Sequence, residues 1–259
     1  MMTAPAIGLA ISFVVILSVI FSGALVGMLI GWLLPDHHLS SELKGVVSVA
    51  MAVVGTVSAL VLGLLISSAS SSFATRNSEI TRTSTDIIRI DQLLHRYGPE
   101  ADAARDSLRR YTAMKLNDLF PDGTDRTPRM DNPATFKMLE QVLDAILALS
   151  PGNERQRWLL ERARQLADEV SETRWLLVEQ NAGAIPLPFL ILLVFWLTLL
   201  FASYGLFAPR NVTAAVALFL CAVAVAGGVE MVLDMAYPFG GLIHISSDPM
   251  RHAVEVINQ

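Results

Sequence analysis

The sequence contains a single cysteine, Cys221, so it can form neither an intramolecular disulfide nor a cysteine-rich metal site. Basic residues are few: 19 Lys and Arg against 24 Asp and Glu give a net charge of −5, which provides no basic surface for nucleic acid. The chain also lacks a glycine-rich phosphate loop, HExxH, GxSxG and any His and acid set at metal-ligand spacing. We therefore expect no enzymatic activity, no metal, no cofactor and no nucleic-acid partner.

Charge is absent from four long stretches of the chain, residues 6–34, 45–66, 187–207 and 212–229. Each stretch is long enough to cross the roughly 30 Å hydrocarbon core of a bilayer as a helix. Only a short polar connection lies within each pair, so the pattern predicts two transmembrane hairpins surrounded by membrane lipid. The first basic residue is Lys44, which is unlike a cleaved signal peptide, so we expect the first stretch to remain as an anchor.

The charges that the spans lack are concentrated between the two hairpins. Residues 67–185 hold 16 of the 19 Lys and Arg residues and 18 of the 24 Asp and Glu residues. Apolar residues recur there at spacings of three, four and seven, as one face of an amphipathic helix requires. We predict an all-α integral membrane protein with four transmembrane helices in two hairpins and a helical cytoplasmic bundle inserted between spans two and three.

These patterns divide the chain into four parts: a first transmembrane hairpin (1–66), the bundle (67–185), a second transmembrane hairpin (186–235) and a tail packed on the bundle (236–259). No Gly or Pro follows the second span until the bundle is reached, so that span can continue as one helix into water. Basic residues near the span ends are slightly more numerous in the middle segment than in the opposite loops. The positive-inside rule therefore favours a cytoplasmic middle domain and cytoplasmic termini.

Three glycines in the first span, Gly23, Gly27 and Gly31, are spaced four apart and form two overlapping GxxxG units. Without side chains, these positions allow another helix backbone to approach closely within the membrane. The second span carries a similar stripe of small residues: Ala52, Gly55, Thr56, Ala59 and Gly63. Two partners are therefore open for the glycines, another span of the same chain, such as the second, or a neighbouring subunit.

Two acidic residues, Glu230 and Asp234, lie four apart on one helical face at the end of the fourth span. Carboxylates in hydrocarbon are costly and usually face a cavity or a cationic partner. Two interpretations remain open: a structural role at headgroup depth, or a role in an ion pathway or in coupling. Candidate partners are Arg76, His244 and Arg251.

The segment after the fourth span has a helix-stopping proline, glycines that permit a tight turn, and then alternating apolar and polar residues. Such a pattern is typical of an extended segment. It would dock on the bundle, or it would line a vestibule or bind an anion near the membrane face. The residues of this tail motif are Pro238, Phe239, Gly241, His244 and Ser246.

Two parts of the sequence resemble a bacterial family of uncharacterised four-span membrane proteins described as bestrophin-like. The first part is LGLLISSASSSF at residues 62–73, followed by DQLL at 91–94 and RYGPE at 96–100. The second part is LDMAYPFGGLIHIS at residues 233–246. The family is distantly similar to the bestrophin channels.

This resemblance implies a homo-oligomeric, mainly anion-conducting ion channel of the bacterial inner membrane, with inorganic ions as its cargo. By analogy with bestrophins, we expect a homopentamer whose pore is lined by the second transmembrane helix. The pore-lining candidates are Val54, Val57, Ser58, Val61 and Leu65.

Two features of the chain depart from bestrophins. The bestrophin neck uses an Ile and two Phe residues of the second span, whereas residues 33–72 here contain no Phe, Tyr or Trp. A constriction would therefore be aliphatic, and apolar constrictions can gate by dewetting. Eukaryotic bestrophins also bind calcium through an acidic run after the last span, whereas only Asp248 and Glu255 follow Asp234 here. We expect no calcium gating.

Two other functions remain as alternatives to a channel. The chain can be a non-conducting membrane scaffold or sensor whose cytoplasmic bundle binds a protein partner. It can also be a proton-coupled transporter that uses Glu230 and Asp234, although the two hairpins show none of the internal repeats typical of transporters.

Overall fold

The computed structural model describes residues 4–34, 41–121, 128–181, 187–209, 211–236, 239 and 241–259. Every regular element in these residues is a helix, which confirms the predicted all-α class. The chain forms two compact units. The first comprises Met1–Ser72 and Ile185–Tyr237, and the second comprises Phe73–Ala184 and Pro238–Gln259.

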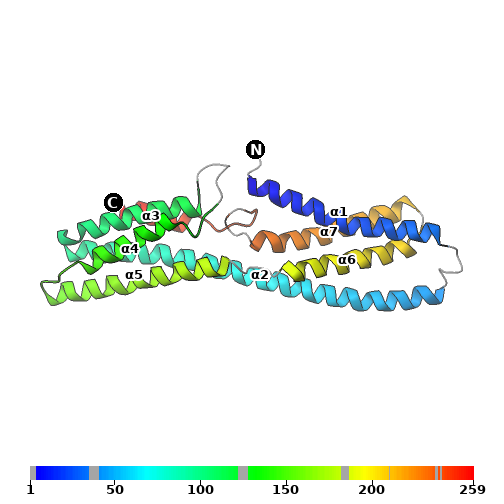
Figure 1. Ribbon diagram of the computed structural model, residues 1–259, viewed down its shortest axis with the longest axis horizontal. Helices are drawn as coiled ribbons and strands as arrows, with labels where there is room; N and C mark the ends of the chain where they lie inside the picture. Colours follow the sequence, from blue (N-terminus) through cyan, green and yellow to red (C-terminus); the bar gives the residue numbers. More distant parts are fainter. Residues whose placement is uncertain are drawn as a thin grey trace. The chain divides into compact units, whose positions relative to one another are not determined.

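The first unit contains α1 (Ala4–Leu33), α6 (Leu187–Phe207), α7 (Val212–Ala236) and the N-terminal part of α2 (Ser41–Tyr97). Each of these four helices is long and apolar enough to cross a membrane. The ribbon shows α1 lying lengthwise beside α6 and α7 (Figure 1), and α1 makes its most extensive contacts with α6.

The interior of the first unit is a small apolar cluster. Its fully buried members come from α1, α6 and α7: Ile20, Ala24, Leu193, Ala222, Ala226 and Val229. By contrast, many large apolar side chains point outward, and Val212 is 80% exposed while Trp32 is 65% exposed. Outward-facing apolar side chains on helices of this length are those that lipid would cover.

The second unit contains the rest of α2 with α3 (Asp102–Leu119), α4 (Pro133–Leu147), α5 (Glu154–Asn181) and α8 (Asp248–Ile257). These helices are amphipathic and share one apolar core. Its largest fully buried members include Ile80, Ile87, Leu94, Tyr111, Leu139, Ile146 and Leu166. The sequence periodicity that predicted the bundle helices corresponds to these buried faces.

Local sequence sets where the helices begin and end. Gly98 adopts φ 127°, a conformation that residues with a side chain rarely reach, and it separates α2 from the short 3-10 helix η2 (Pro99–Ala101). Asn132 caps α4, because its side-chain oxygen accepts a hydrogen bond from the Ala134 amide at 3.0 Å. Pro133, which has no N–H to donate, occupies the first position of that helix.

The helix α2 is continuous over 57 residues and belongs to both units. From residue 45 to residue 72 its outward positions are apolar or small, whereas from residue 73 it is amphipathic, with Ile80, Ile87 and Ile90 buried. No Gly or Pro interrupts the change. One helix therefore supplies a candidate membrane span and a core helix of the bundle.

A short helix follows the tail segment that the sequence analysis expected to be extended, and the sequence analysis did not predict this helix. The ten-residue α8 starts at Asp248 and Pro249 and buries Met250, Ala253 and Ile257, which share one face. Proline early in the helix and apolar residues spaced three and four apart were the available signals.

Candidate functional site

One face of α2 in the first unit packs on the chain's own core. Ser58 is buried at 2% exposure, and Val54, Val61 and Leu65 are partly buried against the apolar cluster of α1, α6 and α7. The Ser58 hydroxyl donates to the Val54 carbonyl at 2.8 Å, so its hydrogen bond is satisfied within the helix. These four pore-lining candidates thus lie on the packed face.

The opposite face of α2 is exposed along the whole apolar stretch. Val57, the fifth pore-lining candidate, is 39% exposed and lies on this face. It shares the face with other large aliphatic residues: Val46, Val49, Val53, Leu60 and Leu64. Their spacing of three and four makes a continuous aliphatic stripe along the helix.

A second stripe on α2, next to the aliphatic one, consists of small residues. Ala52, Thr56, Ala59 and Gly63 are all exposed, and a Cβ placed on Gly63 would meet no atom within 4 Å. Gly55, which the sequence analysis grouped with them, instead faces α6, because a Cβ placed on it would lie 3.8 Å from Leu200. The small-residue stripe is thus uncovered in one copy of the chain.

The three glycines of α1 lie against α6 rather than against the second span, the intramolecular partner suggested from sequence. A Cβ on Gly23 would lie 2.6 Å from the Thr198 carbonyl oxygen, and one on Gly31 would lie 2.6 Å from that of Leu206. A Cβ on Gly27 would overlap the Ala202 carbonyl. Gly205 of α6 makes the reciprocal approach to Ala24, so both helices contribute glycine to one close seam.

The acidic pair on α7 lies within the first unit. The Ser12 hydroxyl of α1 donates to Glu230 Oε1 at 2.7 Å, while the other carboxylate oxygen is buried without a hydrogen-bond partner among the described residues. Asp234, one turn later, is 3% exposed. Sequence reasoning missed Ser12, because a lone serine in an apolar run has no pattern that marks it as a partner.

The tail motif divides into buried and exposed residues. Phe239 stacks edge-on against Phe120, with ring centroids 5.8 Å apart, and Ile245 is 1% exposed. Gly241 is half-buried, whereas His244 and Ser246 are exposed, and the Ser246 hydroxyl accepts a hydrogen bond from the Asp248 amide. Pro238 lies outside the described residues. The described part of the tail therefore docks through its apolar side chains.

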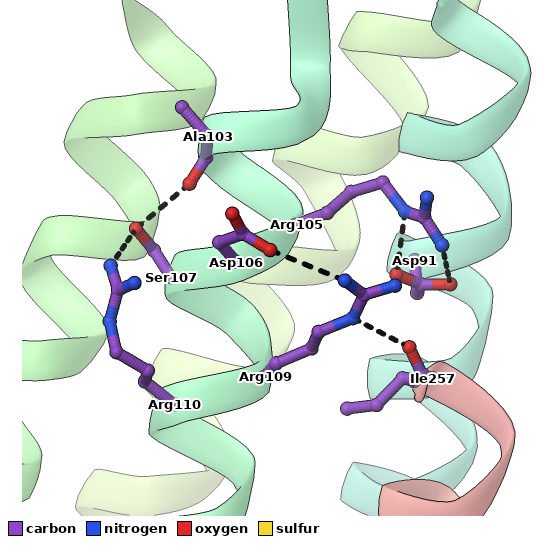
Figure 2. Close-up of polar contacts among 8 residues, drawn as sticks. All are labelled: Asp91, Ala103, Arg105, Asp106, Ser107, Arg109, Arg110 and Ile257. Carbon is purple, nitrogen blue, oxygen red and sulfur yellow. Dashed lines mark hydrogen bonds and ion pairs between the residues drawn. The ribbon is translucent and has the colours of Figure 1, made fainter. Parts of the chain in front are cut away.

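Arginines of α3 join neighbouring segments of the second unit (Figure 2). Arg105 donates from Nε and Nη2 to both oxygens of Asp91 on α2, at 2.9 and 3.0 Å. Arg109 Nε donates at 2.7 Å to the carbonyl of Ile257, the last residue of α8. A cation at this position satisfies an orphan carbonyl and interacts favourably with the negative end of the helix. The tail is therefore anchored at its C-terminal end.

Within the described residues no group of three or more His, Cys, Asp or Glu side chains comes together as a metal site would require. A cavity of about 730 Å³ lies in the first unit at the C-terminal ends of α1 and α6. Its lining includes Trp32, Lys44, Phe207 and Asn211. Among the described residues its lining is mostly apolar, and Lys44 is the one cation.

The sequence and the fold were compared with those of known proteins. A family model described as the bestrophin-like domain matches residues 18–250. A crystal structure of a bacterial bestrophin homolog from Klebsiella pneumoniae, carrying one mutation, superposes with a TM-score of 0.64 at 12% identity, covering 95% of this chain and 99% of that one. A second mutant structure of a Klebsiella pneumoniae homolog gives 0.61 at 13% identity, covering 93% and 99%. No curated protein sequence matches. The structural likeness shows the fold, and because the family match covers most of the chain, this protein belongs to the bestrophin-like family.

Proposed function

We propose that this chain assembles into a homo-oligomeric, anion-conducting channel, a homopentamer in the bacterial inner membrane with its middle domain and both termini in the cytoplasm. Membership of the bestrophin-like family supports this function. Four helices of sufficient length and apolarity supply the spans.

The observation that carries the proposal is the uncovered face of α2. Helices in lipid associate where small side chains let backbones approach, and the exposed stripe of Ala52, Thr56, Ala59 and Gly63 offers such a surface to a neighbouring copy. The adjacent aliphatic stripe, which contains Val57, then faces the axis between copies. Val54, Ser58, Val61 and Leu65 support this wall from the packed side. An aliphatic wall of this kind gates by excluding water.

Ion flux from proteoliposomes tests the proposal. We expect chloride flux from the wild type. Val57→Ala should change the rate of this flux, because a smaller side chain widens the opening that the aliphatic stripe surrounds. Val216→Ala is the matched control, since it makes the same chemical change at an exposed position of α7 rather than of α2. No flux at any pH or voltage, or equal effects of both substitutions, would contradict the pore assignment.

Cysteine accessibility gives an independent test of which face meets water. In a background with Cys221→Ala, a cysteine at Val57 should react with a membrane-impermeant thiol reagent, whereas one at Val216 should not. Equal protection of both positions would place α2 against lipid. The mass of the assembly in mild detergent decides the subunit number, and a monomer would exclude a pore between copies.

A non-conducting scaffold or sensor is the second candidate, and exposed apolar residues of the bundle favour it. Leu147, Trp158, Trp175 and Leu176 are 47–65% exposed on α4 and α5. Large exposed apolar residues mark surfaces for protein partners. Protein that assembles normally but passes no ions, and that retains a partner through these residues, would support this function.

A further inference from the structure

Several charged and polar side chains lie inside the second unit, which is built from amphipathic helices. Tyr111, Lys115 and Asp118 follow one another at spacings of four and three on α3, and they are 0%, 3% and 8% exposed. Arg174 of α5 is 7% exposed and lies close enough to interact electrostatically with Tyr111 and Lys115. The group therefore combines two cations and one carboxylate in an enclosed space.

The carboxylate of this group is already occupied by neutral donors. Asn132 Nδ2 donates to both oxygens of Asp118, at 2.8 and 3.0 Å, and the Thr135 hydroxyl donates to one of them. In the part of the chain that the structure describes, no carboxylate lies within ion-pair distance of Lys115 or Arg174. Asp118 therefore offsets the positive charge only at longer range.

The guanidinium of Arg174 is held by aromatic rings rather than by acceptors. Its central carbon lies 4.5 Å from the centroid of Phe136 and 5.3 Å from that of Trp175. Such contacts stabilise the cation but leave its N–H groups unsatisfied. Both Nε and Nη1 are buried without a hydrogen-bond partner among the described residues, and so is the Tyr111 hydroxyl.

Every unsatisfied atom of this group can act as a donor, and its net charge is positive. A buried donor without an acceptor is costly, and a buried unpaired charge is costlier still. The missing component is therefore an acceptor with negative charge. Consistent with this, burial and then the nearby Arg174 lower the pKa of Lys115 from 10.5 to about 8.

We propose that Lys115, Arg174 and Tyr111 form a binding site for a small inorganic anion inside the second unit. The anion accepts hydrogen bonds from the free guanidinium nitrogens and the phenol, and it neutralises the excess charge between α3 and α5. Chloride and phosphate share the required chemistry. The site does not depend on conduction, because none of its residues belongs to the first unit.

Trp175 provides a reporter for this site, because its ring contacts the Arg174 guanidinium. The full-length protein in detergent is titrated with phosphate, and separately with chloride, replacing gluconate at constant ionic strength. We expect a saturable change in tryptophan emission with at least one anion, lost in Trp175→Phe, and a rise in Tm of about 5 °C at saturation. The anion that saturates identifies the ligand.

Substitutions locate the response. Lys115→Met should abolish saturation, and Tyr111→Phe, which removes only a hydroxyl, should weaken binding by about three- to tenfold. Lys137→Met, which removes an exposed lysine of α4, should bind as the wild type does. If Lys115→Met does not fold, the Tyr111→Phe affinity decides alone.

Two results would overturn the site. One is a wild-type protein whose emission and Tm respond to neither anion. The other is an affinity in Tyr111→Phe and in any folded Lys115→Met protein equal to that of the wild type, which would place the anion elsewhere.

Discussion

Replacement of Gly27 by alanine tests the closest helix contact in the first unit. The added Cβ would overlap the carbonyl group of Ala202, which is backbone and cannot rotate away as a flexible side chain could. The two helices must therefore move apart. Because Gly23, Gly31 and Gly205 also depend on the close approach of α1 and α6, the displacement affects the whole seam.

Two opposing effects set the magnitude. Overpacking of a well-packed interior costs about 1–3 kcal/mol. Alanine is also a better helix former than glycine by about 1 kcal/mol in helix interiors, which acts in the other direction. Because the clash is with backbone and the seam contains four glycines, we expect the clash to dominate, with a net loss of about 2 kcal/mol. Such a loss lowers the ratio of folded to unfolded protein by about thirtyfold.

Unfolding of the purified protein in mixed detergent, followed by tryptophan fluorescence, measures this loss. Gly227→Ala on α7 is the matched control, because a Cβ there would meet no atom within 4 Å. That variant should equal or slightly exceed the wild type in stability. If Gly27→Ala were as stable as Gly227→Ala, the assignment of the α1–α6 seam would be refuted.

Three further predictions concern the second unit. Asp91→Asn should lower the free energy of unfolding by about 3 kcal/mol, because it leaves the mostly buried Arg105 without its bidentate partner. Chemical denaturation measures this loss, and Glu154→Gln, at the exposed pair with Arg157, should change the free energy of unfolding little. Asn132→Ala should lower the free energy of unfolding by about 1–2 kcal/mol in the same measurement, since it removes the cap of α4 and two hydrogen bonds to Asp118. An unchanged free energy of unfolding would refute the role of the cap. In gluconate buffer, the free energy of unfolding should rise between pH 8 and 10 by at most about 3 kcal/mol. In the folded protein Lys115, beside Arg174, Asp118 and Tyr111, releases its proton near pH 8, whereas in the unfolded chain it keeps the proton to about pH 10.5. Thermal melts measure the rise, and Lys115→Met should not show it.

The helices of the bundle were predictable because local sequence determines them. Gly98 and Pro99 end α2, Asn132 and Pro133 start α4, and apolar residues recur at helical spacing between such signals. These effects act over a few residues, so a single sequence reveals them. The missed helix α8 belongs to the same class, since its proline start and apolar spacing were present, but the sequence analysis assigned no secondary structure to residues 248–257.

Partners across the structure were not predictable in the same way. The glycine stripe of α1 specifies a close approach but not which helix makes it, and α6 supplies the matching Gly205. Lys115 and Arg174 illustrate a second difficulty. A cation on an amphipathic helix normally extends into solvent, and only the packing of α3 with its neighbours encloses both side chains.

The pore candidates show why a transmembrane site needs both periodicity and packing for its assignment. Residues 45–66 of α2 carry no charge on any side, so the sequence alone does not separate positions that face a pore from positions that pack on the chain's own core. Packing separates the positions, because a side chain that fills the core of its own chain cannot also face an axis between copies. In the proposed assembly Val57 faces the axis, whereas Ser58, which is buried and whose hydroxyl is bonded to Val54, supports the wall from the packed side. The proposed conduction pathway therefore follows the outward stripe of α2.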